Sequence, residues 1–505
     1  MANPLYDTLF GRHAGSDAPF LILPDGAEVS YDAFLQMAAR IAGHLAASGL
    51  EPGDRLAAQI AKSPEALALY AACAQAGVVF LPLNTAYTAS ELAYFIENSG
   101  ASMVVCDASG REAMEGIAKG QGARVETLNG DGSGSLMEGA AGRPARFETA
   151  TRGEEDLAAL LYTSGTTGRS KGAMLSQKNL LSNAEVLVRE WRFTADDVLL
   201  HCLPIFHTHG LFVASNVTLM AGGAMIFLPK FDVDAVMAHL PRATTMMGVP
   251  TFYTRLLDDA RFDKDATRHM RLFTSGSAPL LAETHDRFRD RTGHAILERY
   301  GMTETNMNTS NPYDGDRRAG TVGFPLPGVE LKVTDPETGE QLPQGEVGQL
   351  EVRGPNVFQG YWQMPEKTAE ELREDGFFIT GDLGLIDSQG YVQIVGRGKD
   401  LIISGGYNIY PKEIELVLDE QPGVLESAVI GVPHPDFGET VVGVLVPEPG
   451  KTPDEAAIMS AAGEALARFK HPRKLIVLDE LPRNTMGKVQ KNILRERFGD
   501  LFATA

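Results

Sequence analysis

The chain has 505 residues, too many for one ordinary core, so we expect a large compound domain and at least one smaller domain. With 44% hydrophobic and 22% charged residues, its composition is that of a globular protein. The formal net charge of −21 argues against nucleic acid and anionic membranes as partners, because both are bound by basic faces.

The N-terminal sequence "MANPLYDTLFGRHAG" lacks the charged and apolar regions of a secretory signal. The most apolar run, "ALALYAACAQAGVVFLPLN" at 66–84, contains Gln75, Gly77 and Pro82. These residues predict a buried helix followed by a strand, not a membrane span.

The three cysteines, Cys73, Cys106 and Cys202, are odd in number and widely spaced. No CxxC pair suggests zinc or redox chemistry. We therefore expect reduced thiols and a cytoplasmic protein.

The first 300 residues alternate alanine- and leucine-rich helical stretches with short β-branched runs. Examples of these runs are "ASMVVCD" (101–107), "VLLHCLPIF" (198–206) and "GAMIFLP" (223–229). This pattern predicts an α/β fold in which parallel sheets are covered by helices.

Beyond about residue 320 the strands become shorter and alternate, with turn signals at "DPETGE" (335–340) and "PQGE" (343–346). We expect a small antiparallel barrel or sheet that completes a large N-terminal domain, 1–397. Helix–strand alternation resumes over 398–505, which predicts a small, mobile α+β lid domain.

The stretch "YTSGTTGRSKG" (162–172) is rich in glycine and hydroxyl groups and contains Lys171. Such a loop can surround a polyphosphate with backbone N–H groups, hydroxyl donors and a positive charge. It does not match the Walker pattern, because glycine follows Lys171 and does not precede it. A flexible surface turn is the alternative from composition alone.

This loop resembles the phosphate-loop signature of the acyl-adenylate-forming superfamily, which comprises ATP-dependent acyl-CoA synthetases, adenylation domains and luciferases. Further motifs occur in the order of that superfamily and cover nearly the whole chain. They are "AGVVFLPLN" (76–84), "PIFHTHG" (204–210), "SGSAPL" (275–280), "ERYGMTE" (298–304), "GEVGQLEVRGPNVFQGYW" (345–362), "TGDLG" (380–384), "GRGKDLIISGGYNIYPKEIE" (396–415) and "PRNTMGKVQK" (482–491).

The resemblance implies an enzyme that activates a carboxylate with ATP before passing it to a thiol. A carboxylate is already ionised at neutral pH and needs no base, but oxide is too poor a leaving group for direct reaction with a thiol. Joining it to AMP provides a good leaving group, and fixed cations stabilise the charge that develops on the phosphates. ATP, Mg²⁺ and the co-substrate CoA are thus implied.

By this resemblance, a set of residues holds ATP and the metal. The β- and γ-phosphates would be held by Thr163, Ser164, Gly165, Thr166, Thr167 and Lys171. Mg²⁺, which prefers oxygen ligands, would be held by Glu304 and Thr163, with Thr303 beside them in the catalytic motif. The adenine slot would comprise Gly276, Ser277, Ala278, Glu298, Tyr300, Gly301 and Met302, with Tyr300 stacking on the base. Asp382 would accept the ribose hydroxyls and Arg397 would add a ribose or phosphate contact; a turn cap is the alternative for Asp382.

The resemblance also assigns the lid. Lys488 would reach the α-phosphate and the substrate carboxylate during adenylation, and Lys399 would be the hinge about which the lid then turns. That rotation would bring the CoA-binding residues Ser404, Gly405, Gly406 and Tyr407 into use. Lys488 is also an expected target of a lysine acetyltransferase and deacetylase, since acetylation removes the required charge.

The identity of the substrate acid is indicated by Arg299. Most relatives that take fatty or aromatic acids have a small or apolar residue at this position. A buried guanidinium is costly unless the substrate supplies an anion, and a short dicarboxylate does so with its second carboxylate. Together, "ERYGMTE" and "PIFHTHG" most resemble malonyl-CoA synthetases. His207 and Ser277 would contact the substrate, while Thr208 and Met302 would bound the space at C2 and decide whether methylmalonate fits.

Several alternatives stay open. Arg299 could pair with Glu298 or another surface acid, and His207 could be a packed structural histidine. The function could be that of an aryl- or medium-chain acyl-CoA synthetase, or of an adenylation enzyme that loads a carrier protein. A luciferase-like oxidase and a non-catalytic nucleotide-binding protein are disfavoured.

Overall fold

A computed structural model describes residues 2–163, 170–278, 280–404, 407–434, 437–466, 468–484 and 488–502. It divides into two units, the first comprising residues 1–331 and 352–378 and the second residues 332–351 and 379–505. No helix among the described residues is long and apolar enough to cross a membrane.

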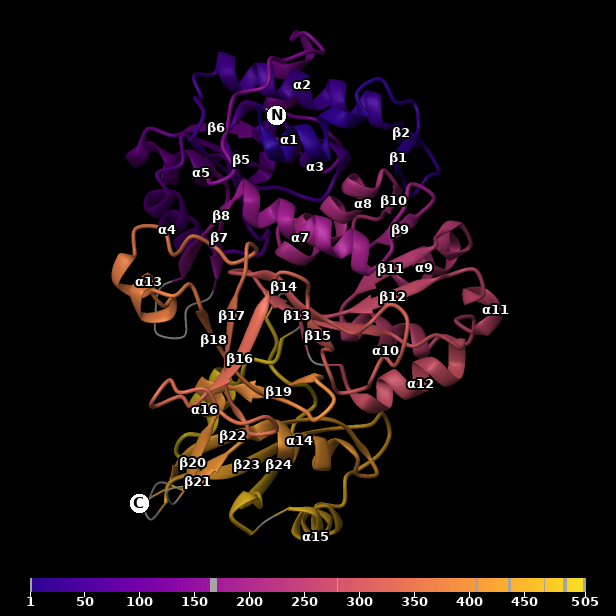
Figure 1. The fold of residues 1–505 in the computed structure, drawn as a ribbon, viewed down its shortest axis with the longest axis vertical. Helices are drawn as coiled ribbons and strands as arrows, with labels where there is room; N and C mark the ends of the chain where they lie inside the picture. The colour runs from indigo at the N-terminus through magenta and orange to yellow at the C-terminus, as the bar shows by residue number, and fades with distance from the viewer. Residues whose placement is uncertain are drawn as a thin grey trace. The chain divides into compact units, whose positions relative to one another are not determined.

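The first unit contains two large sheets (Figure 1). The nine-stranded sheet has the order β15 (Phe324–Pro325), β14 (Asn306–Ser310), β13 (Leu297–Met302), β12 (Leu272–Ser275), β11 (Thr245–Gly248), β9 (Val198–His201), β10 (Ala224–Phe227), β1 (Pro19–Ile22) and β2 (Glu28–Ser30). The six-stranded sheet has the order β6 (Arg124–Thr127), β5 (Met103–Cys106), β3 (Arg55–Gln59), β4 (Val79–Pro82), β7 (Leu157–Thr163) and β8 (Lys171–Ser176). Their inner strands run parallel, as predicted, and antiparallel strands lie at the edges.

Helices cover both faces of each sheet. One apolar core lies between the two sheets and includes α1 (Pro4–Leu9), α2 (Tyr31–Ala47), α3 (Pro64–Ala76), α6 (Ser135–Ala141), α7 (Gln177–Glu190) and α8 (Asn216–Ala221). The far face of the nine-stranded sheet packs on α9 (Val233–His239), α10 (Pro250–Leu257), α11 (Lys264–Thr267) and α12 (Ala282–Thr292). The far face of the six-stranded sheet packs on α4 (Ala89–Ser99) and α5 (Arg111–Ala118).

The alternation of buried side chains explains these layers. In β5, Met103 and Val105 face the core between the sheets, whereas Val104 and Cys106 face α4 and α5. Because successive strand residues point to opposite faces, a strand buried on both sides must be apolar throughout. The continuous apolar runs in the sequence therefore predicted this arrangement correctly.

The predicted buried helix followed by a strand is α3 and β4. The side chain of Ser63 caps α3 by accepting a hydrogen bond from Ala66 N, and Pro64 occupies the first turn. Gly77 ends the helix with φ of 72°, which a glycine adopts without strain.

The second unit contains two smaller sheets. The predicted small antiparallel element is a four-stranded sheet of β16 (Glu330–Thr334), β17 (Gly348–Arg353), β18 (Phe378–Ile386) and β19 (Val392–Arg397), apart from strand ends that belong to the first unit. The other has the order β21 (Tyr407–Ile409), β20 (Ile402–Ser404), β23 (Gly438–Pro447) and β22 (Val424–His434), with β24 (Lys474–Val477) beside β23. Helices α14 (Pro411–Asp419) and α15 (Glu455–Ala465) cover one face, and α16 (Lys491–Phe498) covers the other (Figure 1).

The four-stranded sheet groups with the C-terminal residues, whereas the sequence predicted a large domain that ends at residue 397. Lys399, the predicted hinge, lies in a short helical turn at Gly398–Asp400, inside the second unit. Compactness alone does not test where a chain pivots, so the hinge at Lys399 stays a prediction.

Candidate active site

Parallel strands of the nine-stranded sheet bring three predicted motifs to one edge. His201 at the end of β9 pairs with Met247 of β11, and Ser275 at the end of β12 pairs with Gly248 and Glu298. Since the carboxyl ends of parallel strands lie on the same edge, the residues that follow β9 and β12 are brought close to β13. This edge is the usual ligand site of such sheets.

Arg299 lies at the point where β13 changes partners. Up to Glu298 the strand pairs in parallel with β12, and from Arg299 onward it pairs antiparallel with β14. Arg299 is 2% exposed, and its Nε and Nη2 atoms have no hydrogen-bond partner among the described residues. Burial lowers its pKa to about 10, so the guanidinium stays charged at neutral pH. Glu298 accepts a hydrogen bond from Leu280 N, and no ion pair to Arg299 occurs among the described residues.

The polar side chains around Arg299, the predicted acid pocket, include Thr208, His209 and Ser277, of which Thr208 and His209 are buried. His209 Nδ1 lies 3.2 Å from Ser277 Oγ, while His209 Nε2 and Thr208 Oγ1 have no hydrogen-bond partner. Burial, and secondarily the charge of Arg299, hold the pKa of His209 well below its ordinary value. A Cβ atom at Gly276 would overlap the guanidinium of Arg299, so glycine is required for this approach. Unpartnered donors beside a buried cation are suited to an anion.

His207, the histidine that the sequence favoured, is half-buried, and its Nδ1 accepts a hydrogen bond from His209 N. His209 was not among the residues predicted to contact the acid. Within "PIFHTHG" the two histidines differ by burial, and composition carries no signal of that difference.

The predicted phosphate loop begins and ends at the β7–β8 hairpin. Thr163 and Lys171 are paired in register across this hairpin. Ser164, Gly165, Thr166 and Thr167 lie outside the described residues, so their predicted role is not tested.

Lys171 is held by residues from α13 (Pro365–Glu371) and the segment before it. Its Nζ donates to both carboxylate oxygens of Glu371 at 2.9 Å and to Tyr361 Oη at 3.1 Å. Tyr361 Oη donates in turn to Glu371 at 2.6 Å and lies 3.1 Å from Glu304 Oε1. Glu371 and Tyr361 were not predicted, because several acids crowd "PEKTAEELRE" and none stands out.

Glu304 follows β13 in the tight turn that leads to β14, with Thr303 beside it. It is 5% exposed, and its Oε1 lies 3.4 Å from Thr163 Oγ1. A buried carboxylate and a neighbouring hydroxyl supply the oxygen donors that Mg²⁺ prefers. The pair that the sequence predicted therefore fits the metal.

The remaining predicted adenine-slot residues lie near the same edge. Tyr300 and Met302 pair with Thr309 and Asn306 of β14. Gly301 sits at a bulge where a Cβ atom would overlap Asn306 O. Ser277 and Ala278 follow β12, and Ser277 adopts φ of 69°, an uncommon conformation for a non-glycine residue.

The second unit brings Asp382 and Arg397 together. They are paired in register on β18 and β19, and Arg397 Nε lies 2.9 Å from Asp382 Oδ1. Asp382 is 3% exposed and lies within a strand, so it is not the turn cap considered from the sequence.

The predicted lid residues are described in part. Ser404 ends β20 and pairs with Tyr407 of β21, while Gly405 and Gly406 lie outside the described residues. Lys488 is exposed, and its backbone exchanges hydrogen bonds with Asn484. Burial lowers the pKa of Lys399.

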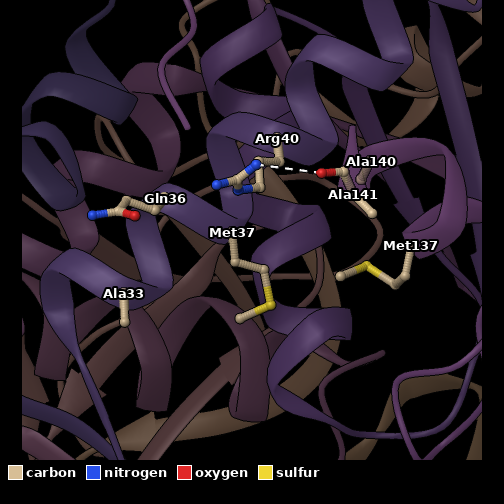
Figure 2. A pocket seen from close by; sticks show the side chains of 7 residues that line it. All are labelled: Ala33, Gln36, Met37, Arg40, Met137, Ala140 and Ala141. Carbon is tan, nitrogen blue, oxygen red and sulfur yellow. Dashed lines mark hydrogen bonds between the residues drawn. The ribbon is translucent and has the colours of Figure 1, made fainter. Parts of the chain in front are cut away.

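A separate hollow of about 290 Å³ lies between α2 and α6 (Figure 2). Met37 and Met137 extend toward it, and Arg40 at its rim donates to the backbone oxygens of Ala141 and Arg143. None of the predicted site residues lines this hollow.

Comparisons with known proteins place the chain in a family. The profile of the AMP-binding enzyme family matches residues 11–362, and that of the AMP-binding enzyme C-terminal domain matches residues 413–488. The chain belongs to the AMP-binding enzyme family. It has the fold of an AMP-forming acyl-CoA ligase, a class of enzyme that uses ATP and CoA.

Relatives and solved structures cover most of the chain. ATP-bound MatB from Rhodopseudomonas palustris is 60% identical, with a TM-score of 0.98 over 99% of this chain and 100% of that one. Feruloyl-CoA synthase of an Amycolatopsis species is 37% identical over 94% of this chain and 95% of its own. Malonate–CoA ligase of Arabidopsis thaliana is 36% identical over 83% of this chain and 74% of its own.

Proposed function

We propose that this enzyme makes malonyl-CoA from malonate, ATP and CoA through an acyl-AMP intermediate, releasing pyrophosphate and then AMP. Methylmalonate is the expected second substrate. The likeness to malonate–CoA ligases and the buried guanidinium of Arg299 support the proposal.

The main support is that no carboxylate among the described residues forms an ion pair with Arg299, and Glu298 beside it contributes only a secondary attraction that raises its pKa. A buried charge with free donors is costly until an anion arrives, and an apolar acyl chain would leave that cost uncompensated. A dicarboxylate can leave one carboxylate to react while the other accepts hydrogen bonds from Nε and Nη2. Thr208 Oγ1, which has no hydrogen-bond partner among the described residues, is a further donor near this position, and His209 Nε2 is another in the tautomer that carries its proton there.

In the proposed first step, an oxygen of the free malonate carboxylate attacks the α-phosphorus of ATP, and the bond to pyrophosphate breaks. Lys171, freed from Glu371, holds the β- and γ-phosphates, and the lid residue Lys488 stabilises charge on the α-phosphate. Asp382 accepts the ribose hydroxyls, and Tyr300 stacks on adenine. Mg²⁺ at Glu304 and Thr163 would supply countercharge to the phosphates when bound.

In the proposed second step, the CoA thiolate attacks the acyl carbon and AMP leaves with the bonding electron pair. The lid turns about Lys399 between the two steps, which exchanges Lys488 for the segment that contains Ser404 and Tyr407. Arg299 holds the distal carboxylate throughout, so the acid need not be bound again.

The proposal predicts that Arg299→Met loses malonate as a substrate. Methionine is apolar and of similar length, so it removes the countercharge without leaving a large cavity. We expect kcat/KM for malonate to fall by about 10²- to 10³-fold, with little change in KM for ATP. ATP-dependent CoA consumption should be measured with malonate, methylmalonate, succinate, acetate, octanoate and 4-coumarate.

Arg268→Met, which removes an exposed arginine of the same unit, is the matched control and should retain wild-type kinetics. Equal activity on octanoate or coumarate that does not depend on Arg299 would contradict the proposal. That outcome would favour the aryl- or medium-chain synthetase. Transfer to an acyl carrier protein with none to CoA would favour the carrier-loading enzyme.

A further inference from the structure

Lys62 is a partly buried cation that lies outside every motif of the predicted site. It follows β3 and directly precedes Ser63, the cap of α3. Its Nζ donates to both Nδ1 and the carbonyl oxygen of His201 at 2.8 Å, and it lies 4.3 Å from the centre of the Phe227 ring. Burial lowers its pKa to about 7. No carboxylate among the described residues forms an ion pair with it.

The carbonyl oxygen of Gly210 determines which nitrogen of His201 carries the proton, because a carbonyl can only accept and Nε2 lies 2.9 Å from it. Nδ1 is then unprotonated and accepts a hydrogen bond from the ammonium of Lys62, which therefore holds the ring from its other side. Nε2 then donates to Gly210 O at 2.9 Å. Burial, followed by the charge of Lys62, holds the pKa of His201 well below its ordinary value, so the ring stays neutral with this tautomer.

Gly210 belongs to a π-helical turn, His209–Ser215, that begins directly after Thr208. Its carbonyl oxygen also accepts a hydrogen bond from Ser215 Oγ at 2.9 Å. A Cβ atom at Gly210 would overlap Pro204 O, so the turn has little room to move. Isolated π-helical turns are uncommon and occur often at functional sites.

The same turn carries the buried donors of the acid pocket. His209 bonds Ser277 through Nδ1, and Gly276 beside Ser277 packs directly on the Arg299 guanidinium. Hydrogen bonds and close packing thus connect Lys62 to His201, the π-helical turn and the acid pocket, without Lys62 itself bonding to any pocket residue.

We propose that Lys62 is a positioning residue for the acid substrate: by anchoring the ring and the carbonyl of His201, it holds the hydrogen bond to Gly210 and so fixes the π-helical turn next to Thr208 and His209, beside Arg299. The inference rests on the proposed function only in taking the pocket around Arg299 as the site of the acid. It assigns Lys62 no contact with the substrate or ATP.

The test is steady-state kinetics of the full-length Lys62→Met enzyme. Methionine keeps an apolar stem and removes the donors, so we expect KM for malonate to rise by about tenfold or more, while KM for ATP changes less than about twofold. Lys62→Arg keeps the donors and should restore part of the affinity. Lys178→Met, at an exposed lysine that pairs with Glu155, is the control and should resemble the wild type.

A double-mutant cycle separates positioning from general loss of packing. If Lys62 acts through His201, then His201→Leu and the double variant should have nearly the same KM for malonate, because the second change removes nothing further. Additive effects would overturn the proposal, as would a KM for the acid that stays within about twofold of wild type in Lys62→Met.

A measurement on the wild type covers the case in which the variants do not fold. In ring ¹⁵N spectra of histidine-labelled enzyme, the signal of His201, assigned by through-bond correlation to its own backbone, should be that of a neutral, Nε2-protonated ring that does not titrate between about pH 6 and 8. Any other protonation state would overturn the tautomer assignment. If the wild type prefers another acid, the proposed function fails, but the kinetics can be repeated with that acid and still decide the role of Lys62.

Discussion

At the scale of single residues, the ion pair between Lys171 and Glu371 is expected to oppose ATP binding. Both carboxylate oxygens of Glu371 accept hydrogen bonds from Lys171 Nζ. A triphosphate must therefore compete with Glu371 for the same ammonium. A partly exposed pair of this kind contributes about 1 kcal/mol. Glu371→Gln should therefore lower KM for ATP by about three- to tenfold, measured at saturating acid and CoA.

Glu370→Gln is the matched control, because Glu370 is the preceding residue on α13 and pairs with Lys367, not Lys171. It should leave KM for ATP unchanged. If Glu371→Gln instead raises KM for ATP, the acid orients Lys171 for the phosphates and does not compete with them.

These residues mark the limit of what the sequence predicts about the site. Lys171 and Glu304 were found because each lies in a motif whose neighbours indicate its chemistry. Glu371 lies 200 positions from Lys171, and nothing in "PEKTAEELRE" separates it from Glu370. From the sequence alone, Lys62 would be taken for an exposed lysine before a helix cap. Its partial burial depends on contacts with His201 and Phe227, which lie far along the chain.

At the scale of secondary structure, α14 ends on a carboxylate in an unfavourable place. Asp419 is its last residue, where the helix dipole disfavours a negative charge, and burial raises the pKa of Asp419 to about 6. The folded chain therefore holds this proton more tightly than the unfolded chain. Stability from this group is greatest below about pH 4, falls as pH rises to about 6 and is constant above that.

Asp419→Asn should remove this loss of folding stability at neutral and higher pH. The amide oxygen can still accept the hydrogen bond from Ser427 Oγ, now 2.7 Å from Asp419 Oδ1. We expect a gain of up to about 2 kcal/mol at pH 8 and almost none at pH 4, measured by calorimetry as the shift of the unfolding transition. Glu420→Gln, at the exposed next residue, should give no such pH-dependent gain. An equal gain at both pH values would show that the effect is not ionisation of Asp419.

Elements with regular periodicity were predicted well, and irregular ones were not. The continuous apolar runs identified β5, β9 and β10, and the "DPETGE" turn joins Asp335 N to Glu340 O as expected. By contrast, "HGLFVAS" has the composition of a buried α-helix, and its π-helical form is accompanied by hydrogen bonds to Gly210 O from the side chains of His201 and Ser215. The change of partner along β13 likewise depends on neighbours, not on local propensity.

At the scale of the whole molecule, the predicted ATP residues are shared between two units. Lys171, Glu304 and Tyr300 belong to the first unit, whereas Asp382 and Lys488 belong to the second. The sequence pattern predicted a change from helix–strand alternation to short strands near residue 320. It carried no information that the four-stranded sheet groups with the C-terminal residues. Grouping depends on packing between strands distant in sequence, which periodicity does not encode.

This division predicts that the two half-reactions can be separated by a single change in the second unit. Lys488 is exposed, and its proposed contact with the α-phosphate is needed only while pyrophosphate departs. Lys488→Ala should reduce acid-dependent ATP–pyrophosphate exchange by about 10²-fold or more, since it removes charge stabilisation from the transition state. Transfer of a supplied acyl-AMP to CoA should change by less than about threefold, because that step uses a different lid position.

Lys474→Ala, at another exposed lysine of the same unit, should leave both rates near wild type. Equal loss of both half-reactions in Lys488→Ala would instead mean that the lysine supports the lid itself, and the two-position cycle about Lys399 would lose its main support.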